Sequence, residues 1–584
     1  MIDRLIKDSR SGRWKTMKRI MPYLRLLMRR DSILVIVIAA MIGVTVIYPL
    51  SIMVYGTFQT TPPGESSPLT LVNYVTMFSG DWFWEALGHT IWISIGGMIL
   101  GVFLGVSMAW IVTRTDTPWV GKLEIPLIVP FFLSPFIGAL AWTGLASADY
   151  GLINGWFDAL FGVRPFEIFS PWGMIWVMGL YYSPYAFLIV SGTMRNMDPT
   201  LEEAALSAGA TKFQTMLRIT LPLMAPGILA SALLIFVAAA EQFGIPSVLG
   251  LNQRWFVLTT RIFYFLREYP QDYSMAATVA MVMLVFTGGM VFLRNRIIKK
   301  REFVTVGGKS FRPHVIPLGR WRYLTLSYLL SYIMLAVILP FGTFIAISFF
   351  KFWSIHPKLK YLTLENWNFI LFEYPSTWIA LKNSLFLSIV GAAVAVLISA
   401  VIAWVVVRTK AFGKDALDTI ATLPVAVPGL ILGVAYLWAW IRSPIPIYGT
   451  IWILMIVYVS RFIPYSLRSS ESALRQIDKS LEESANISGA SWLRTFWSVS
   501  LPLLKPGLVA GFILLFVTFM RELSCSILLY SSGTEVMSVT MFDLWHDGMF
   551  PNLAAIGTMQ LVVTAVCLML FSKLFKIRIT EVVK

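Results

Sequence analysis

Long apolar stretches separated by short polar segments run through the whole chain. A transmembrane helix needs about 20 mainly apolar residues, and twelve stretches of roughly that length are present. They are residues 33–55, 90–112, 125–145, 172–193, 227–243, 274–293, 323–349, 384–407, 420–441, 450–467, 507–523 and 553–571. This pattern predicts an all-α polytopic membrane protein with about 12 transmembrane helices.

A polar segment in the first half of the chain comes back in the second half. Residues 201–228, LEEAALSAGATKFQTMLRITLPLMAPGI, recur as residues 481–508, LEESANISGASWLRTFWSVSLPLLKPGL. The same interval of 280 residues separates the Pro-Tyr pair at 184–185 from the pair at 464–465. An internal repeat of this kind indicates two structural units of one design.

The repeat extends over most of the chain. Residues 69–73 match 362–366, and residues 109–115 match 403–409, at intervals of 293 and 294. The interval then falls to 280, so the first half carries about 14 extra residues, which we assign to the external loop 146–171. An even number of spans precedes each half, so both halves run in the same direction, as in parallel transporter repeats. We expect two six-helix halves related by a pseudo-twofold axis along the membrane normal.

Each copy of the repeated segment has the pattern of a short helix followed by a break. Residues 201–208 are helix formers with carboxylates in the first turn, where the helix dipole favours negative charge. Gly209 and Gly489 are placed to end these helices as C-terminal caps. In the first copy, Pro222 and Pro226 are then expected to interrupt the backbone before the next apolar run.

The repeated segment resembles the EAA loop of binding-protein-dependent ABC importers, the cytoplasmic loop of the membrane subunit that docks on the ATPase. The first copy reads EAA at 203–205 and is followed by Gly209. The second copy reads ESA at 483–485, with serine in place of the middle alanine, and is followed by Gly489. The resemblance implies that the following residues dock the ATPase: Glu202, Glu203, Ala205, Gly209, Glu482, Glu483, Ala485 and Gly489.

The resemblance also implies a fold, partners and a mechanism. The chain would be the permease of a type I importer, working by alternating access. A separate ATPase subunit in two copies would carry the ATP and magnesium, and this chain would bind no cofactor. A periplasmic or lipid-anchored binding protein would deliver the substrate. A single chain with an EAA loop in each half looks most like ferric-iron permeases, while thiamine permeases share this arrangement and phosphonate or sugar-phosphate permeases come close to it.

Composition and charge agree with a membrane protein. Hydrophobic residues make up 57% of the chain and charged residues 13%, about half the charged share of a soluble protein. Residues 1–32 hold ten Lys and Arg against three acids, and residues 294–322 hold nine against one. Basic segments next to spans are typical of the cytoplasmic side and of contact with anionic lipid. We therefore expect a multi-pass inner-membrane protein with both termini in the cytoplasm and no nucleic-acid partner, despite the net charge of +16.

These patterns together divide the chain into segments. The predicted division is a basic N-terminus 1–32, a first permease half 33–293 with its core at about 86–293 and its EAA loop at 195–226, a cytoplasmic linker 294–322, a second half 323–572 with its core at about 380–572 and its EAA loop at 468–506, and a cytoplasmic tail 573–584.

Ionisable side chains appear at matched places in the fifth and eleventh spans. Glu241 and Gln242 lie 280 residues before Arg521 and Glu522. Ionisable groups within a membrane are costly and usually face a cavity or a partner. They are therefore candidates for a translocation pathway or gate. The alternative is an ion pair between Glu241 and Arg521 across the pseudo-twofold axis, which the opposite charges at matched positions slightly favour.

Two other motifs suggest chemistry that we reject. Residues 307–310 read GGKS, but a phosphate-binding loop needs another glycine five residues before its last glycine, where Phe303 stands. Asp543, His546 and Asp547 share one helical face, which allows a metal cluster, although a solvated helix that contacts an external partner fits better. We expect no catalytic residue and no metal site in this chain.

Two functions from other classes remain as alternatives. An ion-coupled secondary transporter would leave the repeated polar loops unexplained. A membrane enzyme would need a convergent catalytic set, and the chain has only four histidines and no metal motif.

Overall fold

The computed structural model describes residues 30–65, 67–198, 200–300 and 315–575. In these residues the regular structure is helical, with two isolated bridges and no strand. Ten helical stretches are long and apolar enough to span a membrane, and two bent helix pairs raise this number to twelve. The predicted all-α membrane fold is confirmed. The rejected 307–310 motif and most of the predicted N-terminal and C-terminal segments lie outside the described residues.

The helices of the first half follow one another in this order: α3 (Arg30–Ile42), η1 (Gly43–Ile47), α4 (Tyr48–Gly56), α5 (Val72–Ser79), α6 (Asp81–Arg114), α7 (Val120–Phe132), α8 (Pro135–Ala146), α9 (Leu152–Phe161), α10 (Pro171–Arg195), α11 (Thr200–Ser207), α12 (Lys212–Thr215), η2 (Met216–Thr220), α13 (Leu221–Ala240), α14 (Gly244–Leu249), η3 (Leu251–Gln253), α15 (Leu258–Arg267) and α16 (Tyr273–Lys300).

The helices of the second half are η4 (Gly319–Trp321), α17 (Arg322–Ile333), η5 (Met334–Ile338), α18 (Leu339–Ile347), η6 (Leu359–Tyr361), α19 (Glu365–Asn368), η7 (Phe369–Glu373), α20 (Ser376–Phe386), η8 (Leu387–Gly391), α21 (Ala392–Arg408), α22 (Lys414–Thr422), η9 (Leu423–Ala426), α23 (Gly429–Trp440), α24 (Ile451–Gln476), α25 (Ser480–Ile487), α26 (Trp492–Thr495), η10 (Phe496–Ser500), α27 (Leu501–Met520), α28 (Ser526–Leu529), α29 (Met537–His546) and α30 (Phe550–Phe575).

Prolines near the start of four helices widen the preceding turn without ending the span. The π-helical turns η1, η2, η5 and η10 lie shortly before Pro49, Pro222, Pro340 and Pro502. A proline ring clashes with the carbonyl four residues back, which in each case lies inside the π turn, where the wider backbone gives it room. The predicted interruption at Pro222 and Pro226 is therefore wrong, because the helix continues through both prolines to the end of α13.

Two of the predicted spans are sharply bent. α7 and α8 meet at 98°, and the segment formed by α22 and η9 meets α23 at 105°. The breaks fall directly before Pro135 and around Pro428. Residues 125–145 and 420–441 are thus corrected from single spans to bent pairs. Their apolar composition is continuous, but the prolines end the hydrogen-bonded helix halfway.

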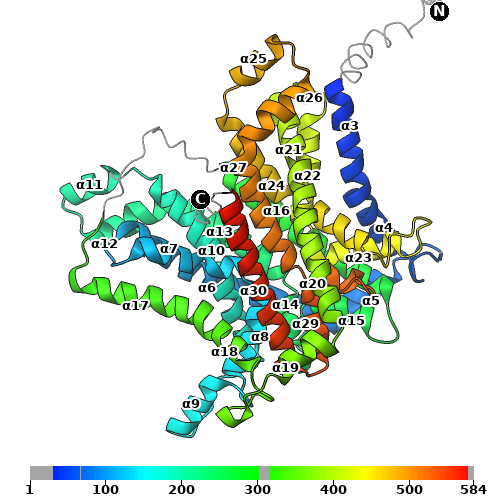
Figure 1. The fold of residues 1–584 in the computed structure, drawn as a ribbon. Coiled ribbons are helices and arrows are strands. Elements are labelled where there is room, and N and C mark those ends of the chain that lie inside the picture. Colours follow the sequence, from blue (N-terminus) through cyan, green and yellow to red (C-terminus); the bar gives the residue numbers. More distant parts are fainter. Residues whose placement is uncertain (1–29, 66, 199, 301–314, 576–584) are drawn as a thin grey trace, which may run out of the picture.

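The first span of each half packs against the other half. α4 lies on α23, and the Tyr436 hydroxyl donates a hydrogen bond to the Thr45 carbonyl oxygen at 2.5 Å. In the same way α18 lies on α8, where Trp353 Nε1 donates to the Gly144 carbonyl oxygen at 3.0 Å. Figure 1 shows α17, the beginning of that span, beside α7. The two halves are therefore interlocked by an exchange of their first helices.

The matching segments 69–73 and 362–366 have the same structural role. Asn73 Nδ2 donates hydrogen bonds to the Thr57 and Gln59 carbonyl oxygens, at 2.9 and 2.7 Å. Asn366 Nδ2 likewise bonds two carbonyl oxygens just after α18, at 3.0 and 2.8 Å. Each asparagine is buried and fastens a loop to the end of the first span, which explains why this short motif recurs.

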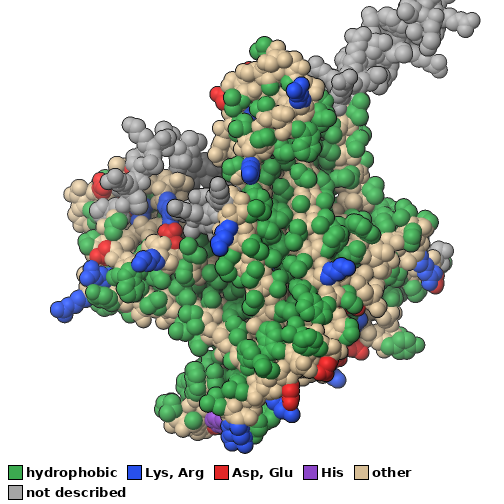
Figure 2. Space-filling view, viewed as in Figure 1, with side chains coloured by type: hydrophobic (Ala, Val, Ile, Leu, Met, Phe, Trp, Pro, Cys, Tyr) green, Lys and Arg blue, Asp and Glu red, His purple; other side chains and the backbone are tan. Residues whose placement is uncertain are grey.

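The extra residues of the first half form the helix α9 and its flanking loops. Asn154 Nδ2 donates to the carbonyl oxygens of Ser147 and Phe166, at 2.8 and 2.7 Å, so the loop is packed. α9 projects from the end of the molecule opposite α11 and α25 (Figure 1). On the face drawn in Figure 2, hydrophobic side chains cover the flanks of the bundle while charged ones lie mostly toward its edges, which suits a lipid surrounding.

Candidate functional site

A cavity of about 140 Å³ lies where the two halves meet. Its walls come from the middle of α10 and α24, from the ends of α13 and α27, and from the break between α7 and α8. All four residues predicted for a pathway or gate lie in this wall: Glu241, Gln242, Arg521 and Glu522. The fold therefore brings together the polar residues that the sequence singled out, and their role in transport stays a prediction.

Arg521 reaches from the second half to the break in the first. Its Nη1 donates hydrogen bonds to the carbonyl oxygens of Phe131 and Leu133, at 2.6 and 2.9 Å. The last carbonyls of a helix have no partner within the helix and lie at the negative end of its dipole. The guanidinium group therefore satisfies carbonyls at the α7–α8 break and joins the two halves at the cavity.

Glu522 is held within its own half by Arg461 of α24. Glu522 Oε1 lies 2.9 Å from Arg461 Nη1, and the two side chains are 9% and 13% exposed. The same oxygen accepts the backbone N–H of Cys525 at 3.0 Å. The sequence reasoning missed Arg461, although a lone arginine in the apolar run 450–467 is a signal that could have found it.

The alternative ion pair between Glu241 and Arg521 is not formed among the described residues. Arg521 bonds the two main-chain carbonyls instead. Glu241 ends α13 and lies in the cavity wall with Tyr182 and Tyr465. The matched positions were correctly read as neighbouring, but the break in α7–α8 offers Arg521 acceptors that the sequence did not reveal.

The two repeated loops form on the same side of the molecule, α11 with α12 and α25 with α26 (Figure 1). Gly209 has φ +88° and Gly489 has φ +85°. After each helix a backbone hydrogen bond of 3.0 Å closes the turn, from Ala210 N to Ala205 O in the first copy. These are the glycine caps that the sequence predicts. Glu203, Glu483, Gly209 and Gly489 are exposed, while Ala205 and Ala485 are half-buried.

Glu202 and Glu482, the other two members of the predicted docking set, point into the bundle. Glu202 accepts a hydrogen bond from Thr220 Oγ1 at 2.7 Å, and one of its oxygens lies 3.5 Å from Arg114 Nη1. Glu482 accepts from Ser500 Oγ at 2.8 Å and from Arg408 Nε at 3.2 Å. All of these side chains lie inside the bundle, where they fasten each loop to the end of α6 or α21. Adjacent glutamates in the sequence thus face in opposite directions, because successive helix positions point to different sides.

The cluster around α29 is an ion-pair site. Asp543 Oδ1 lies 3.6 Å from Arg267 Nη2 and accepts a hydrogen bond from the Tyr530 hydroxyl at 3.3 Å. Burial raises the pKa of Asp543, and the charge of Arg267 opposes this rise. His546 and Asp547 are exposed. Within the described residues no group of three or more His, Cys, Asp or Glu side chains is arranged to hold a metal.

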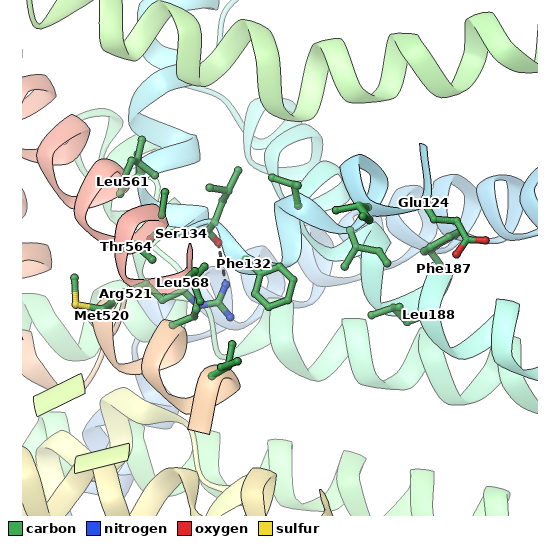
Figure 3. A pocket seen from close by; sticks show the side chains of 18 of the residues that line it. Glu124, Phe132, Ser134, Phe187, Leu188, Met520, Arg521, Leu561, Thr564 and Leu568 are labelled. Atoms are coloured by element: carbon green, nitrogen blue, oxygen red, sulfur yellow. Dashed lines mark hydrogen bonds between the residues drawn. The ribbon is translucent and has the colours of Figure 1, made fainter. Parts of the chain in front are cut away.

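A larger groove of about 550 Å³ leads toward the same place between the halves. It runs between α7 and α10 of the first half and α27 and α30 of the second, and its walls are mainly apolar. Figure 3 shows Glu124 at one end and Arg521, Met520 and Thr564 toward the other. The Glu124 carboxylate is paired with Arg195 at 2.6 Å. The groove shares Arg521 with the small cavity, so this side chain stands between the two spaces.

Comparison with known families decides what kind of protein has this cavity and these loops. The model of the family described as "binding-protein-dependent transport system inner membrane component" matches residues 97–301 and again residues 395–580. The chain belongs to this family. It is the permease of a binding-protein-dependent ABC importer, with two copies of the family's domain, and thus a transport subunit rather than an enzyme. As a family member it is a multi-pass component of the inner membrane.

Named relatives of this permease align over most of its length. The ferric transport system permease protein FbpB of Actinobacillus pleuropneumoniae is 29% identical over 480 residues, which cover 81% of this chain and 69% of the relative. The Fe(3+)-transport system permease protein FbpB 2 of Haemophilus influenzae is 23% identical, covering 84% and 90%. The sulfate transport system permease protein CysT of Escherichia coli is 27% identical over 204 residues, covering 35% and 72%.

Solved structures of ABC importers are also similar to this permease. A crystal structure of a bacterial ABC transporter involved in the import of the acidic polysaccharide alginate aligns with a TM-score of 0.39 and 19% identity, covering 50% of this chain and 100% of the other.

Proposed function

We propose that this permease carries ferric iron across the inner membrane. The observation that carries the proposal is the extent of the alignments. The relatives named for ferric or Fe(3+) transport align over 81% and 84% of the chain, whereas the sulfate permease aligns over 35%. Thiamine, phosphonate and sugar-phosphate import remain the alternatives within the same architecture.

A separate ATPase, in two copies, drives transport through the two repeated loops. The support is geometric, because both loops lie on one side of the molecule and present exposed carboxylates and exposed glycine caps (Figure 1). Glu203, Ala205 and Gly209, with Glu483, Ala485 and Gly489, make the contact surface. Glu202 and Glu482 act indirectly, because their buried ion pairs carry the movement of each loop to α6 and α21. The ATPase holds ATP and magnesium, and this chain binds neither.

Substrate passes between the halves by alternating access. A periplasmic or lipid-anchored binding protein delivers it at the face opposite the loops, where α9 projects. The cavity lined by Glu241, Gln242, Arg521 and Glu522 is the narrow part of the pathway, and the groove beyond Arg521 leads away from it. This assignment places both chain termini and the linker 294–322 in the cytoplasm. The permease halves are then residues 33–293 and 323–572.

Transport by the complete complex tests the proposal. The permease, its ATPase and its binding protein are reconstituted in lipid vesicles, and ATP-dependent uptake of radioactive iron is measured. We expect iron uptake, and we expect that excess thiamine, phosphonate or sugar phosphate does not inhibit it. Uptake of one of these compounds in place of iron would overturn the ferric assignment and leave the family membership intact. A vesicle preparation without ATPase serves as the control, because a secondary transporter would work without it.

A further inference from the structure

Several oxygen atoms in the cavity wall make no hydrogen bond with the described residues. Tyr185 and Tyr465 occupy matched positions, each directly after a proline inside its helix. Both side chains line the cavity, and neither hydroxyl has a hydrogen-bond partner in the described chain. Tyr181, only 1% exposed, also lines the cavity with an unpartnered hydroxyl. The matched residues Tyr185 and Tyr465 therefore line one small space with hydroxyls that lack partners, while the Tyr181 hydroxyl is packed against Gly138.

The charged groups of the cavity differ in whether they already have an ion-pair or hydrogen-bond partner. Arg461 is paired with Glu522 at 2.9 Å, and Arg521 donates from Nη1 to two main-chain carbonyls. Glu241, by contrast, has neither an ion pair nor a hydrogen bond through its side chain in the described part of the protein. The side chains left without a partner thus include the Glu241 carboxylate, the Tyr185 and Tyr465 phenols and the Gln242 amide, and each of them can offer an oxygen atom.

This donor set suits a hard cation. The softness of its ligands decides which metals a site prefers, and a site of carboxylate and phenol oxygens suits hard cations rather than soft ones. Ferric ion is small, triply charged and hard. A water molecule takes up about 30 Å³ in the liquid, so a cavity of about 140 Å³ has room for an ion with a few of its waters.

We propose that Glu241, Tyr185 and Tyr465 form a transit site for Fe³⁺ at the interface of the halves, with Tyr181 beside it. The inference rests on the proposed import of ferric iron. Each phenol that binds iron gives its proton to water as the Fe–O bond forms, and the iron stays in its ferric state. Arg461 and Arg521 in the same wall repel the cation and keep the site weak, since a transported ion must leave as readily as it enters.

Absorption spectroscopy tests the site directly. The purified permease–ATPase complex in detergent is titrated with ferric nitrilotriacetate. Phenolate bound to Fe³⁺ absorbs visible light by charge transfer, so a saturable band is expected with the unchanged protein. Ga³⁺, which has the same charge, should displace the Fe³⁺ and so remove the band. Replacing Tyr185 and Tyr465 together by Phe should remove the band, and Glu241→Gln should weaken binding about tenfold or more. Tyr436→Phe, a buried tyrosine outside the cavity, should leave the band as it was.

Two results would overturn the site. One is the absence of a visible band in the unchanged protein, and the other is a band that survives in the double Phe variant. Melting temperatures of all variants are measured alongside, so that a misfolded protein is not read as a lost ligand. The uptake experiment can fail independently of the spectroscopic one. If the band depends on Tyr185 and Tyr465 but vesicles with the complete complex take up no iron, the site is supported and the proposed function is rejected.

Discussion

The two repeated loops have nearly the same backbone but are fastened to the bundle to different degrees. In the second half, Arg408 donates from Nε to Glu482 at 3.2 Å and from Nη2 to the Ile477 carbonyl oxygen at 2.7 Å. In the first half, the matching Arg114 lies 3.5 Å from Glu202, and its Nε and Nη1 atoms make no hydrogen bond within the described residues. The same pair of residue types thus gives a closely bonded contact on one side and a loose one on the other.

The difference teaches that the two halves of this permease can respond unequally if, as proposed above, one ATPase dimer docks on both loops. We expect a loop that is bonded through a buried pair to move together with its span. A loop whose arginine is incompletely bonded can shift before the span follows. We therefore expect the second loop to transmit movement more directly than the first.

The largest expected effect comes from breaking the closer contact. Arg408→Met leaves the Glu482 carboxylate buried without its cation, which costs about 3–5 kcal/mol when burial is complete. Thermal unfolding in detergent should show the loss, and so should the amount of ATPase that co-purifies. Arg114→Met should cost clearly less. The variant Arg408→Met with Glu482→Met should recover stability, because no charge is left unpaired. Equal losses at Arg408 and Arg114 would contradict the comparison.

The glycine caps test docking without disturbing the bundle. Gly209 and Gly489 have positive φ, and a Cβ built on either meets no atom within 4 Å. Alanine therefore introduces about 1–2 kcal/mol of backbone strain and nothing else, while aspartate adds a negative charge at the contact surface. We expect Gly→Asp at both sites to abolish ATPase retention and uptake while the protein stays in the membrane, and Gly→Ala to retain part of both. Uptake at the original rate in the double Asp variant would refute docking at these loops.

Arg521 and Glu241 occupy matched positions in the two halves, so mutating both tests whether the halves differ at the cavity as well. Arg521→Met frees the carbonyls of Phe131 and Leu133, and a hydrogen bond from a charged donor contributes about 1.5–3 kcal/mol. Glu241→Gln removes no bond that the described residues form, so it should change uptake but hardly change stability. The two effects on stability should add in a double-mutant cycle. Recovery of stability in the double variant would instead support the ion pair that the sequence suggested.

The smallest effect is expected at the ion pair in which Arg267 of the first half meets Asp543 of the second. Burial raises the pKa of Asp543 in the folded protein. The folded state therefore holds its proton to higher pH than the unfolded chain, and stability falls as pH rises from 3.8, the ordinary pKa, through the raised value. Asp543→Asn should flatten this part of the curve of melting temperature against pH. An unchanged slope would show that another group titrates there.

Much of the fold could be predicted, because the signals that set it are local. Apolar length gives the spans, and the interval of 280 residues gives the two halves and the matched Pro-Tyr pairs. The bends were not predictable from composition, since an apolar run reads the same whether it is straight or broken. The continuation through Pro222 was missed for a related reason, because a π turn can absorb a proline and leaves no mark in hydropathy.

The site was predictable in position but not in its pairing. Glu241 and Arg521 do line one cavity, as their matched places implied. Which partner each charge takes depends on where carbonyls and side chains from other helices end, and a sequence does not contain those distances. Glu202 and Glu203 show the same limit at close range, since both lie in one motif and only the packing against Arg114 separates a buried carboxylate from an exposed one.

The exchange of first helices has a consequence for synthesis at the ribosome. α4 packs on α23, so the surface that receives the first span is made only after about 380 further residues have been translated. Until then the N-terminal helix must remain in the lipid without its final neighbour. The first half cannot complete its packing as a separate unit, although larger proteins commonly fold domain by domain. Cutting the gene in the linker would therefore yield two pieces. Each piece would be without the first helix of the other half, which packs against it in the complete chain.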